Sequence, residues 1–520
     1  MKFLFTLLLT VFSYSLLAQF PMHGSVVPFR QVMLEYPEVK GTDVYHISII
    51  RESDRKIVYA ASDSSVAHFV KELLDFGQTY RCSVQATAAG KNMPQLTVWS
   101  FSTKASVTSN NLKNTITVYD SVDATDGLIC LDYGIIINRK GETVLCHPSI
   151  VDAVRHFRVN PNGRITFVSD FVAECNLGGD YLWKTKQIQW KNQFIGNFHH
   201  QIGFVPGGNY LMLMTRKDSL NPMSSEDIVA EVDYKKDIVH FWSERPYNPA
   251  CDSAGSFHIN SIAIGNKNED FLISCRDISS VICVNRKSGL PRYVIGKNIG
   301  SSVPAYAQAN FEVQHAASFT SAGDVLLFNN GNRSRRGTVS SIQLFSSPKA
   351  VSPPQLLWEY KFNFALPEEN FCAKTGSVEE VPNGNFLITQ GVWNRHFEVT
   401  KGKKIVWECL TERRADSSAP WSKAGSFSAH YISSLYPCYF TATLNDGGHL
   451  LLTNEGSEPD KYEVFLLKGE KNEKLLHTVS LLAGSISYVD LPKSVLKRKQ
   501  TIVVRSKTAG RANQRVVVTN

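Results

Sequence analysis

The sequence predicts an all-β protein: a six-bladed β-propeller flanked by amino-terminal and carboxy-terminal β-sandwich domains. Almost every apolar segment is short, rich in Val, Ile, Phe and Tyr, and bounded by Gly, Asn, Asp or Pro, which is typical of strands and hairpins. Helical periodicity is scarce, and residues 66–76 are the one plausible short helix or helical turn. An internal repeat, whose units begin roughly 57 to 62 residues apart, predicts the propeller.

The amino terminus predicts a secretory signal peptide over residues 1–18. Lys2 gives a short positive start, and residues 3–17 form an apolar run too short for a comfortable membrane span, followed by Ala18 as a small residue for cleavage. We therefore expect an exported protein, in the periplasm, at the cell surface or secreted. No later stretch approaches the roughly 20 continuous apolar residues of a spanning helix, so no transmembrane segment is expected after cleavage.

Three domains follow the signal peptide in the predicted organisation. Residues 24–104 alternate strands and turns over about the length of an immunoglobulin-like or fibronectin-like sandwich. The propeller is expected over residues 112–437. Residues 439–520 contain strand-like segments such as HLLLTN and TIVVRS, which predict a second sandwich with a role in adhesion, docking or sorting.

The repeat is clearest in four successive units, each with a strand, a polar turn and a second apolar strand. They are HHQIGFVPGGNYLMLM from His199, FHINSIAIGNKNEDFLISCRD from Phe257, QHAASFTSAGDVLLFNNG from Gln314 and GSVEEVPNGNFLITQG from Gly376. Weaker units at GLICLDYGIIINRKGETVLCH and around residues 157–190 bring the expected number of blades to six. Blades pack on two neighbours, which explains strands that are apolar on both faces, such as FLIS and VLLF.

Composition is that of an ordinary globular protein, with 43% hydrophobic and 20% charged residues among 520 and a net charge of +8. The basic residues are spread along the chain without a nucleic-acid-binding motif, so no nucleic-acid partner is expected. The ten cysteines form no CxxC pair, and most are expected to be buried small hydrophobes. Cys275 and Cys283, in adjacent strand-like runs, are the pair to examine for a disulfide.

Histidine placement is the informative feature for function. His200, His258 and His315 open three consecutive units at what the alignment of the repeats gives as one position. In a propeller this position starts the innermost strand, so the three imidazoles are predicted to point toward one end of the central channel. A lone histidine is usually structural, whereas repetition at one phase favours a shared site.

The segment FHINSI from Phe257, followed by DFLISCRDISSVICVNRKSGLPRYVIG, resembles a blade of the arylsulfate sulfotransferase family. QHAA from Gln314, running on to LLFNNGNRSRR, resembles the next blade of that family, as does VPNGNFLITQG leading to FEVTKGKKIVWE. The resemblance covers about residues 170–436.

This resemblance implies an exported transferase in which a channel histidine takes the sulfuryl group of an aryl sulfate and passes it to a phenol in ping-pong fashion. It implies that His258 and His315 bind and polarise the group and that Arg333 clamps it, with Arg335 nearly tied for that role. Asn260 would orient its neighbours, and His200 would help to bind the substrate. Aryl sulfates and phenols are the expected partners, and no cofactor or nucleotide sulfate donor is expected; the oligomeric state stays open.

The chain departs from the family at the nucleophile. Where family members carry their nucleophilic histidine after a glycine-rich turn, this sequence reads QGVWNRH, and His396 arrives two or three positions late. His396 is therefore either the nucleophile or a histidine packed within a strand. In the second case His258 or His315 must be the nucleophile, or the chain is not an active transferase.

Two other classes of function remain open. The first is a binding protein of the cell envelope that displays loops on an inactive propeller. The second is a metal-dependent enzyme with several channel histidines as ligands, although no carboxylate or cysteine stands at a matching repeat position, so no metal ligands are assigned. No G-x-S-x-G elbow, P-loop or dinucleotide-binding fingerprint occurs in the sequence.

Overall fold

The computed structural model describes residues 19–37, 39–63, 67–105, 110–190, 193–205, 208–217, 225–233, 235–248, 256–265, 267–297, 299, 303–306, 310–331, 338–347, 353–423, 425–437, 440–444, 449–454, 456, 460–468, 472–482, 485–492, 500–506 and 515–519. The predicted signal peptide, Arg333 and Arg335 lie outside the described residues. The chain divides into two compact units, one formed chiefly by the residues up to Lys104 and one by the residues that follow.

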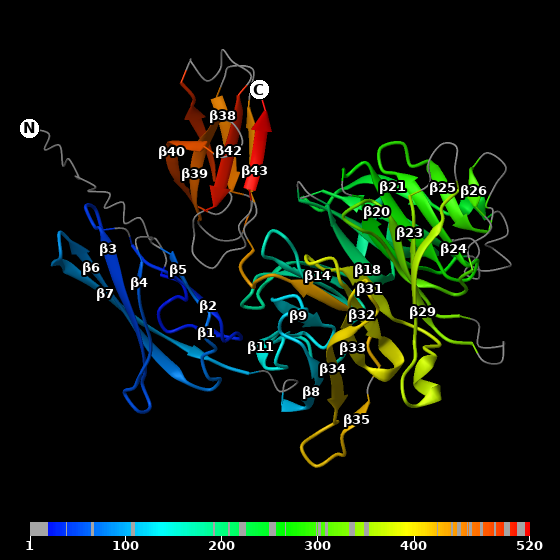
Figure 1. Cartoon of the computed structure of the whole chain (residues 1–520), viewed down its shortest axis with the longest axis horizontal. Coiled ribbons are helices and arrows are strands. Elements are labelled where there is room, and N and C mark those ends of the chain that lie inside the picture. The colour runs from blue at the N-terminus through cyan, green and yellow to red at the C-terminus, as the bar shows by residue number, and fades with distance from the viewer. Residues whose placement is uncertain are drawn as a thin grey trace, which may run out of the picture. The chain divides into compact units, whose positions relative to one another are not determined.

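The first unit contains a five-stranded sheet in the order β1-β7-β6-β3-β4 and a two-stranded sheet β2-β5 (Figure 1). Their strands are β1 (Val26–Val27), β2 (Val32–Glu35), β3 (Val44–Arg51), β4 (Ile57–Asp63), β5 (Ala67–Val70), β6 (Thr79–Ala88) and β7 (Lys91–Thr103). The short helix or helical turn predicted at residues 66–76 is wrong, because residues 67–70 form β5. Leu34 pairs with His68 across the β2-β5 ladder, and burial of Phe69 and Val70 against the core outweighs local helical preference.

Six sheets of four or more strands, antiparallel except for the β25-β26 pair, follow one another between residues 112 and 432 in the described part of the second unit. The first contains β9 (Leu128–Leu131), β10 (Ile135–Asn138) and β11 (Thr143–Cys146), completed by β36 (Ala429–Ile432) from far along the chain. The second contains β12 (His156–Val159), β13 (Ile165–Val168), β14 (Val172–Cys175) and β15 (Tyr181–Thr185), and a hairpin of β16 (Gln187–Trp190) and β17 (Gln193–Gly196) follows it.

The third and fourth sheets repeat the same up-and-down order. They contain β18 (Phe198–Val205), β19 (Asn209–Lys217), β20 (Ser225–Val232) and β21 (Ile238–Ser243), then, after the 3-10 helix η1 (Arg245–Tyr247), β22 (Ile259–Ile264), β23 (Asp270–Cys275), β24 (Ser280–Asn285), β25 (Pro291–Gly296) and β26 (Ala305–Tyr306).

The fifth and sixth sheets contain the strands between residues 315 and 423 and one strand from before the first sheet. They are β27 (His315–Phe319), β28 (Val325–Asn329), β29 (Ser341–Phe345) and β30 (Leu356–Lys361), then β31 (Ser377–Glu380), β32 (Phe386–Gln390), β33 (Arg395–Val399), β34 (Ile405–Arg413) and β35 (Ser422–Lys423), with β8 (Leu112–Tyr119) paired to β34. The 3-10 helices η2 (Pro367–Asn370) and η3 (Gly391–Trp393) lie in the connections.

Hydrophobic clusters lie between successive sheets, as expected when blades pack face to face. One cluster joins Val168 of the second sheet to Met212 of the third, and another joins Leu213 of the third to Ile273 of the fourth. The first strands also contact one another in the order β36, β12, β18, β22, β27, β31 and back to β36. The edge strands of the six sheets thus surround a common axis, and the all-β prediction is confirmed.

A buried carboxylate secures the strand that closes the first sheet. Asp132 accepts hydrogen bonds from the Ser426 hydroxyl (3.0 Å) and from the backbone N–H groups of Phe427 and Ser428. Burial raises the pKa of Asp132 to about 7, while these donors act in the opposite direction. The segment that leads into β36 is therefore tied to the first sheet by side-chain as well as ladder hydrogen bonds.

The last described strands form two further sheets, β37-β38-β41 and β40-β39-β42-β43, around one hydrophobic cluster. Their bounds are β37 (Phe440–Leu444), β38 (His449–Asn454), β39 (Asp460–Lys468), β40 (Asn472–Leu481), β41 (Ile486–Asp490), β42 (Thr501–Ser506) and β43 (Arg515–Thr519). In the part of the chain that the structure describes, no helix has the length and apolar character needed to cross a membrane.

The eight cysteines among the described residues are all free and buried, as predicted. The suggested disulfide between Cys275 and Cys283 is wrong. Cys275 pairs with Ser280 across the β23-β24 ladder and Cys283 pairs with Leu272, so the two thiols do not face each other. Cys251 and Cys438 lie outside the described residues.

Candidate functional site

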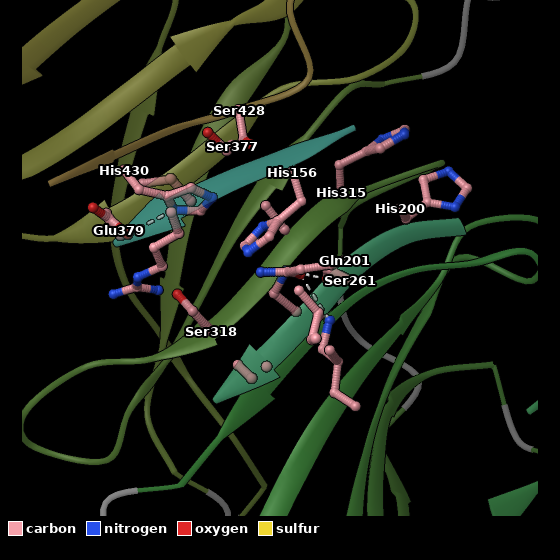
Figure 2. A pocket seen from close by; sticks show the side chains of 18 of the residues that line it. His156, His200, Gln201, Ser261, His315, Ser318, Ser377, Glu379, Ser428 and His430 are labelled. Atoms are coloured by element: carbon pink, nitrogen blue, oxygen red, sulfur yellow. Dashed lines mark hydrogen bonds and ion pairs between the residues drawn. The ribbon is translucent and has the colours of Figure 1, made fainter. Parts of the chain in front are cut away.

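A cavity of about 450 Å³ lies on the common axis of the six sheets, and the strands β12, β18, β22, β27, β31 and β36 line it. Polar side chains link neighbouring strands of this lining. The Gln201 side-chain oxygen accepts the Ile262 N–H (3.0 Å), and the Ser261 hydroxyl accepts the Ala317 N–H (3.0 Å). These links fix the spacing of the strands and thereby the backbone positions of the side chains that face the cavity (Figure 2).

His315, at the start of β27, lines the cavity and has a defined tautomer. Its Nδ1 lies 2.7 Å from Oδ1 of the buried Asn330. The Asn330 amide nitrogen donates to the carbonyl oxygens of Cys372 (2.8 Å) and Thr375 (2.9 Å), which fixes the orientation of the amide. Asn330 Oδ1 must then accept, so Nδ1 of His315 carries the proton and Nε2 carries the lone pair.

His315 is also neutral at ordinary pH. Burial lowers its pKa to about 4, with the hydrogen bond to Asn330 acting in the opposite direction. A neutral imidazole whose Nδ1 proton is held by an acceptor presents Nε2 as a nucleophile or a base. His315 therefore has the protonation state that group transfer through histidine requires.

His200 lies in β18 and lines the same cavity, with a left-handed backbone (φ 54°). Its Nδ1 is 2.9 Å from Nδ1 of His199, whose Nε2 is 3.4 Å from a carboxylate oxygen of Asp227. Burial lowers the pKa of His200 well below the ordinary value, and the neighbouring His199, His258 and His315 add to this effect. Asp227, His199 and His200 thus form a chain that leads from a buried carboxylate to the cavity.

His258 occupies a different place from the one that the repeat alignment gives. It precedes β22 and its carbonyl accepts the Arg276 N–H, just as the carbonyl of Asn197 accepts the Thr215 N–H in the preceding sheet. Both residues have a positive φ, 54° and 61°. His258 therefore corresponds to Asn197 and not to His200. Its ring centroid is 5.5 Å from that of His200, but it is outside the cavity lining.

Asn260, two residues after His258, lies at the cavity wall where His258 was expected. Its amide nitrogen donates to the carbonyl of Gln314 (2.8 Å), the residue before His315, so Asn260 positions the backbone next to that histidine. Its buried Oδ1 has no hydrogen-bond partner among the described residues. Asn260 therefore offers the cavity an acceptor, which suits a ligand O–H group.

His396 lies within β33, fully buried and outside the cavity lining. Its Nδ1 is 3.1 Å from the Thr389 hydroxyl on the neighbouring strand, and burial lowers its pKa to about 3. The geometry is that of a histidine packed within a strand, the second of the two interpretations above. The η3 turn does not bring it to the cavity.

Sequence reasoning missed six charged or ionisable residues of the cavity wall: Arg155, His156, Arg158, Glu379, Glu380 and His430. His156 starts β12, and His430 lies in β36, so both occur in innermost strands like His200 and His315. The signal was present, because a histidine starts or lies near the start of these strands too. The repeat unit that contains β12 was predicted to begin at residue 157, one position after His156. The strand β36 was not recognised as part of the first sheet.

Metal ligation finds no support in the described part of the chain. No group of three or more His, Cys, Asp and Glu side chains there is arranged to hold a metal ion. The cavity wall offers imidazole nitrogens, the carboxylates of Glu379 and Glu380, and the guanidinium groups of Arg155 and Arg158, of which the guanidinium groups suit an anionic ligand.

Residues 213–413 match the arylsulfotransferase (ASST) family. The match confirms the resemblance predicted from the sequence. It begins within β19 and ends with β34. It contains His258, Asn260, His315 and His396, whereas His156, His200 and His430 lie outside it. At the level of the family, the match supports a sulfotransferase enzyme. No curated protein matches the chain.

Solved structures similar to the chain share little sequence with it. A protein of unknown function from Bacteroides caccae is 13% identical, with 55% of this chain and 93% of that chain covered and a TM-score of 0.36. Streptogramin B lyase is 10% identical, with 66% and 95% covered and a TM-score of 0.34. The β-propeller domain of Myceliophteria thermophila Cps50 (Swd1) is 12% identical, with 62% and 88% covered and a TM-score of 0.25.

Proposed function

We propose that this chain is an exported aryl sulfotransferase that moves a sulfuryl group from a phenolic sulfate ester to a phenol through His315. The observation that carries the proposal is the hydrogen bond from His315 Nδ1 to Asn330 Oδ1, which leaves the Nε2 lone pair of a neutral imidazole at the cavity wall. The family match supports the reaction class.

The first half-reaction follows from this tautomer. Nε2 of His315 attacks the sulfur of the aryl sulfate, the N–S bond forms, and the S–O bond to the ring breaks with its electron pair on the departing phenolate. Asn330 Oδ1 keeps the Nδ1 proton in place and stabilises the positive charge that develops on the ring. A second phenol then attacks the sulfur, and the N–S electron pair returns to Nε2.

Charged and polar groups around His315 would hold the sulfuryl oxygens during both steps. Arg155 lines the cavity and lies close enough to His200 to contribute to its lowered pKa. The predicted roles of Arg333 and Arg335 remain part of this proposal, as does that of His258 beside His200. His396 has no role in it.

The proposed architecture is a six-bladed propeller over residues 112–437 with the sixth sheet adjoining the first, between sandwich domains at residues 24–104 and 439–520. Ring contact among the six innermost strands supports this count. Export through a signal peptide at residues 1–18 completes the proposal. Sequencing the amino terminus of protein recovered from the periplasm or the medium tests it, with Gln19 as the expected first residue.

The test of function is the release of p-nitrophenol from p-nitrophenyl sulfate, with and without phenol as acceptor. We expect a burst of about one equivalent per protein without acceptor, steady turnover with phenol, and no requirement for a nucleotide sulfate. The variant His315→Gln should lose the burst, and the matched control His396→Gln should retain it. Absence of burst and turnover with every aryl sulfate tried would contradict the proposal and favour a binding protein.

A further inference from the structure

A second cluster of ionisable side chains lines the cavity, and the donor half-reaction does not use it. It consists of Arg158 and His156 from β12, Glu379 from β31 and His430 from β36. Figure 2 shows Glu379 and His430 on one side of the view and His200 and His315 on the other, with His156 between them. One cavity therefore contains two different sets of histidines.

The hydrogen bonds of His430 define its tautomer. Its Nδ1 lies 3.2 Å from Oε2 of Glu379, and the other oxygen of that carboxylate accepts the backbone N–H of Tyr431. Burial raises the pKa of Glu379, but the hydrogen bond from His430, the charge of the protonated form of His430 and the charge of Arg158 outweigh it, so the pKa lies below its ordinary value. An ionised carboxylate only accepts, so Nδ1 of His430 carries a proton, and in the neutral form of the ring Nε2 carries the lone pair.

That Nε2 atom is buried and has no hydrogen-bond partner among the described residues, and the same holds for Nε2 of His156. The two rings meet edge to face with centroids 5.0 Å apart. Burial, His430 and Arg158 together lower the pKa of His156 well below its ordinary value, so this ring is neutral. A buried polar atom without a partner is costly, and a ligand with an O–H group in the cavity would satisfy it.

We propose that His430, oriented by Glu379, is the general base that deprotonates the acceptor phenol in the sulfuryl transfer. The inference rests on the proposed function, and it assigns a catalytic residue outside the segment that matches the family. Phenols have a pKa of about 10, so a neutral acceptor must lose its proton as it attacks. Arg158, which also lines the cavity, supplies positive charge beside the oxygen that becomes negative.

The proposed step balances as follows. The phenol O–H proton moves to Nε2 of His430, the phenol oxygen forms a bond to sulfur, and the N–S bond to His315 breaks with its electron pair returning to Nε2 of that histidine. The proton on His430 then passes to the phenolate that leaves the next donor. Glu379 holds the Nδ1 proton throughout and is a positioning residue.

The experiment measures the two half-reactions separately in His430→Gln and in the milder variant Glu379→Gln. The burst from p-nitrophenyl sulfate should stay within about twofold of wild type, because its leaving group needs no proton. Transfer to phenol should fall about 10²- to 10⁴-fold in His430→Gln, while transfer to phenols already ionised at the assay pH should fall far less. The dependence of rate on acceptor acidity should therefore become steeper.

Glu359→Gln is the matched control. Glu359 lies in β30, outside the cavity lining, and its carboxylate accepts hydrogen bonds from the Ser341 hydroxyl (3.0 Å) and the Gln343 side-chain amide (2.9 Å), so this variant should leave both half-reactions unchanged. Equal loss with neutral and ionised acceptors, loss of the burst, or no loss at all in His430→Gln would overturn the inference. If wild type itself gives no burst, the failure lies with the proposed function.

Discussion

The substitution Asn330→Asp tests the link between the His315 tautomer and catalysis. It replaces the amide oxygen that accepts the Nδ1 proton, 2.7 Å away, by a carboxylate oxygen. An opposite charge at this range raises a histidine pKa by about 1 to 3 units, from the wild-type value of about 4. A rise of about two units leaves about one tenth of the His315 rings neutral at pH 5.

The expected result is a pH-dependent loss of the burst, because only the neutral ring is a nucleophile. At pH 5 the burst rate of Asn330→Asp should be about tenfold below wild type, and at pH 8 it should recover. The assay is single-turnover release of p-nitrophenol, quenched into alkali and read by absorbance. The ratio of rates at pH 8 and pH 5 within one variant does not depend on the amount of active protein.

Stability must be separated from catalysis in this variant, because the amide donors to Cys372 and Thr375 are lost at a cost of about 1 to 3 kcal/mol each. A thermal melt shows whether the variant is folded. The matched control is Asn329→Asp, because Asn329 uses its side-chain oxygen to accept the N–H groups of Glu312 and Gly331 and does not contact His315. A ratio in Asn330→Asp equal to that of wild type would mean that residue 330 does not control the protonation of His315.

Three further predictions concern stability and cofactors. Buried His396 has a pKa of about 3 in the folded state against about 6.5 when unfolded, so below pH 6.5 the unfolded state binds more protons and the free energy of unfolding decreases as the pH is lowered. The variant His396→Gln should remove about 2 kcal/mol of this decrease between pH 6.5 and pH 5. Urea titrations that show the same acid sensitivity in wild type and variant would contradict this. Gly391→Ala should lower stability by about 1 to 3 kcal/mol, because its Cβ would collide with the Ser426 carbonyl and Thr375, whereas Gly402→Ala meets only ordinary contacts and should not lower Tm comparably. Prolonged chelation should leave the burst unchanged, because His315 supplies the electron pair itself; a lost burst restored by Zn²⁺ would contradict the mechanism.

The repeat made most of the second unit predictable from sequence. Alternation of short apolar runs and polar turns located the first strands β18, β22, β27 and β31, because adjacent strands in one sheet are also adjacent in sequence. It did not reveal that β36 completes a sheet formed by residues 128–146, since that pairing joins segments almost 300 residues apart and leaves no local pattern.

The sequence repeat also located part of the candidate site. His200 and His315 were placed in the cavity wall correctly, because they lie within innermost strands whose position the repeat defines. His258 was misplaced by two positions, because β-bulges at the start of β18 and β22 differ in length and shift the alignment of the repeats. The tautomer of His315 depends on Asn330, whose contacts to Cys372 and Thr375 exist only in the folded chain.

Mass spectrometry tests transfer of the sulfuryl group through His315. The protein is incubated with p-nitrophenyl sulfate without acceptor, digested at neutral to alkaline pH, and its peptides are searched for an added sulfuryl group. We expect modification on His315, its disappearance after addition of phenol, and its absence in His315→Gln. Modification on His396 or His258 in place of His315 would contradict it.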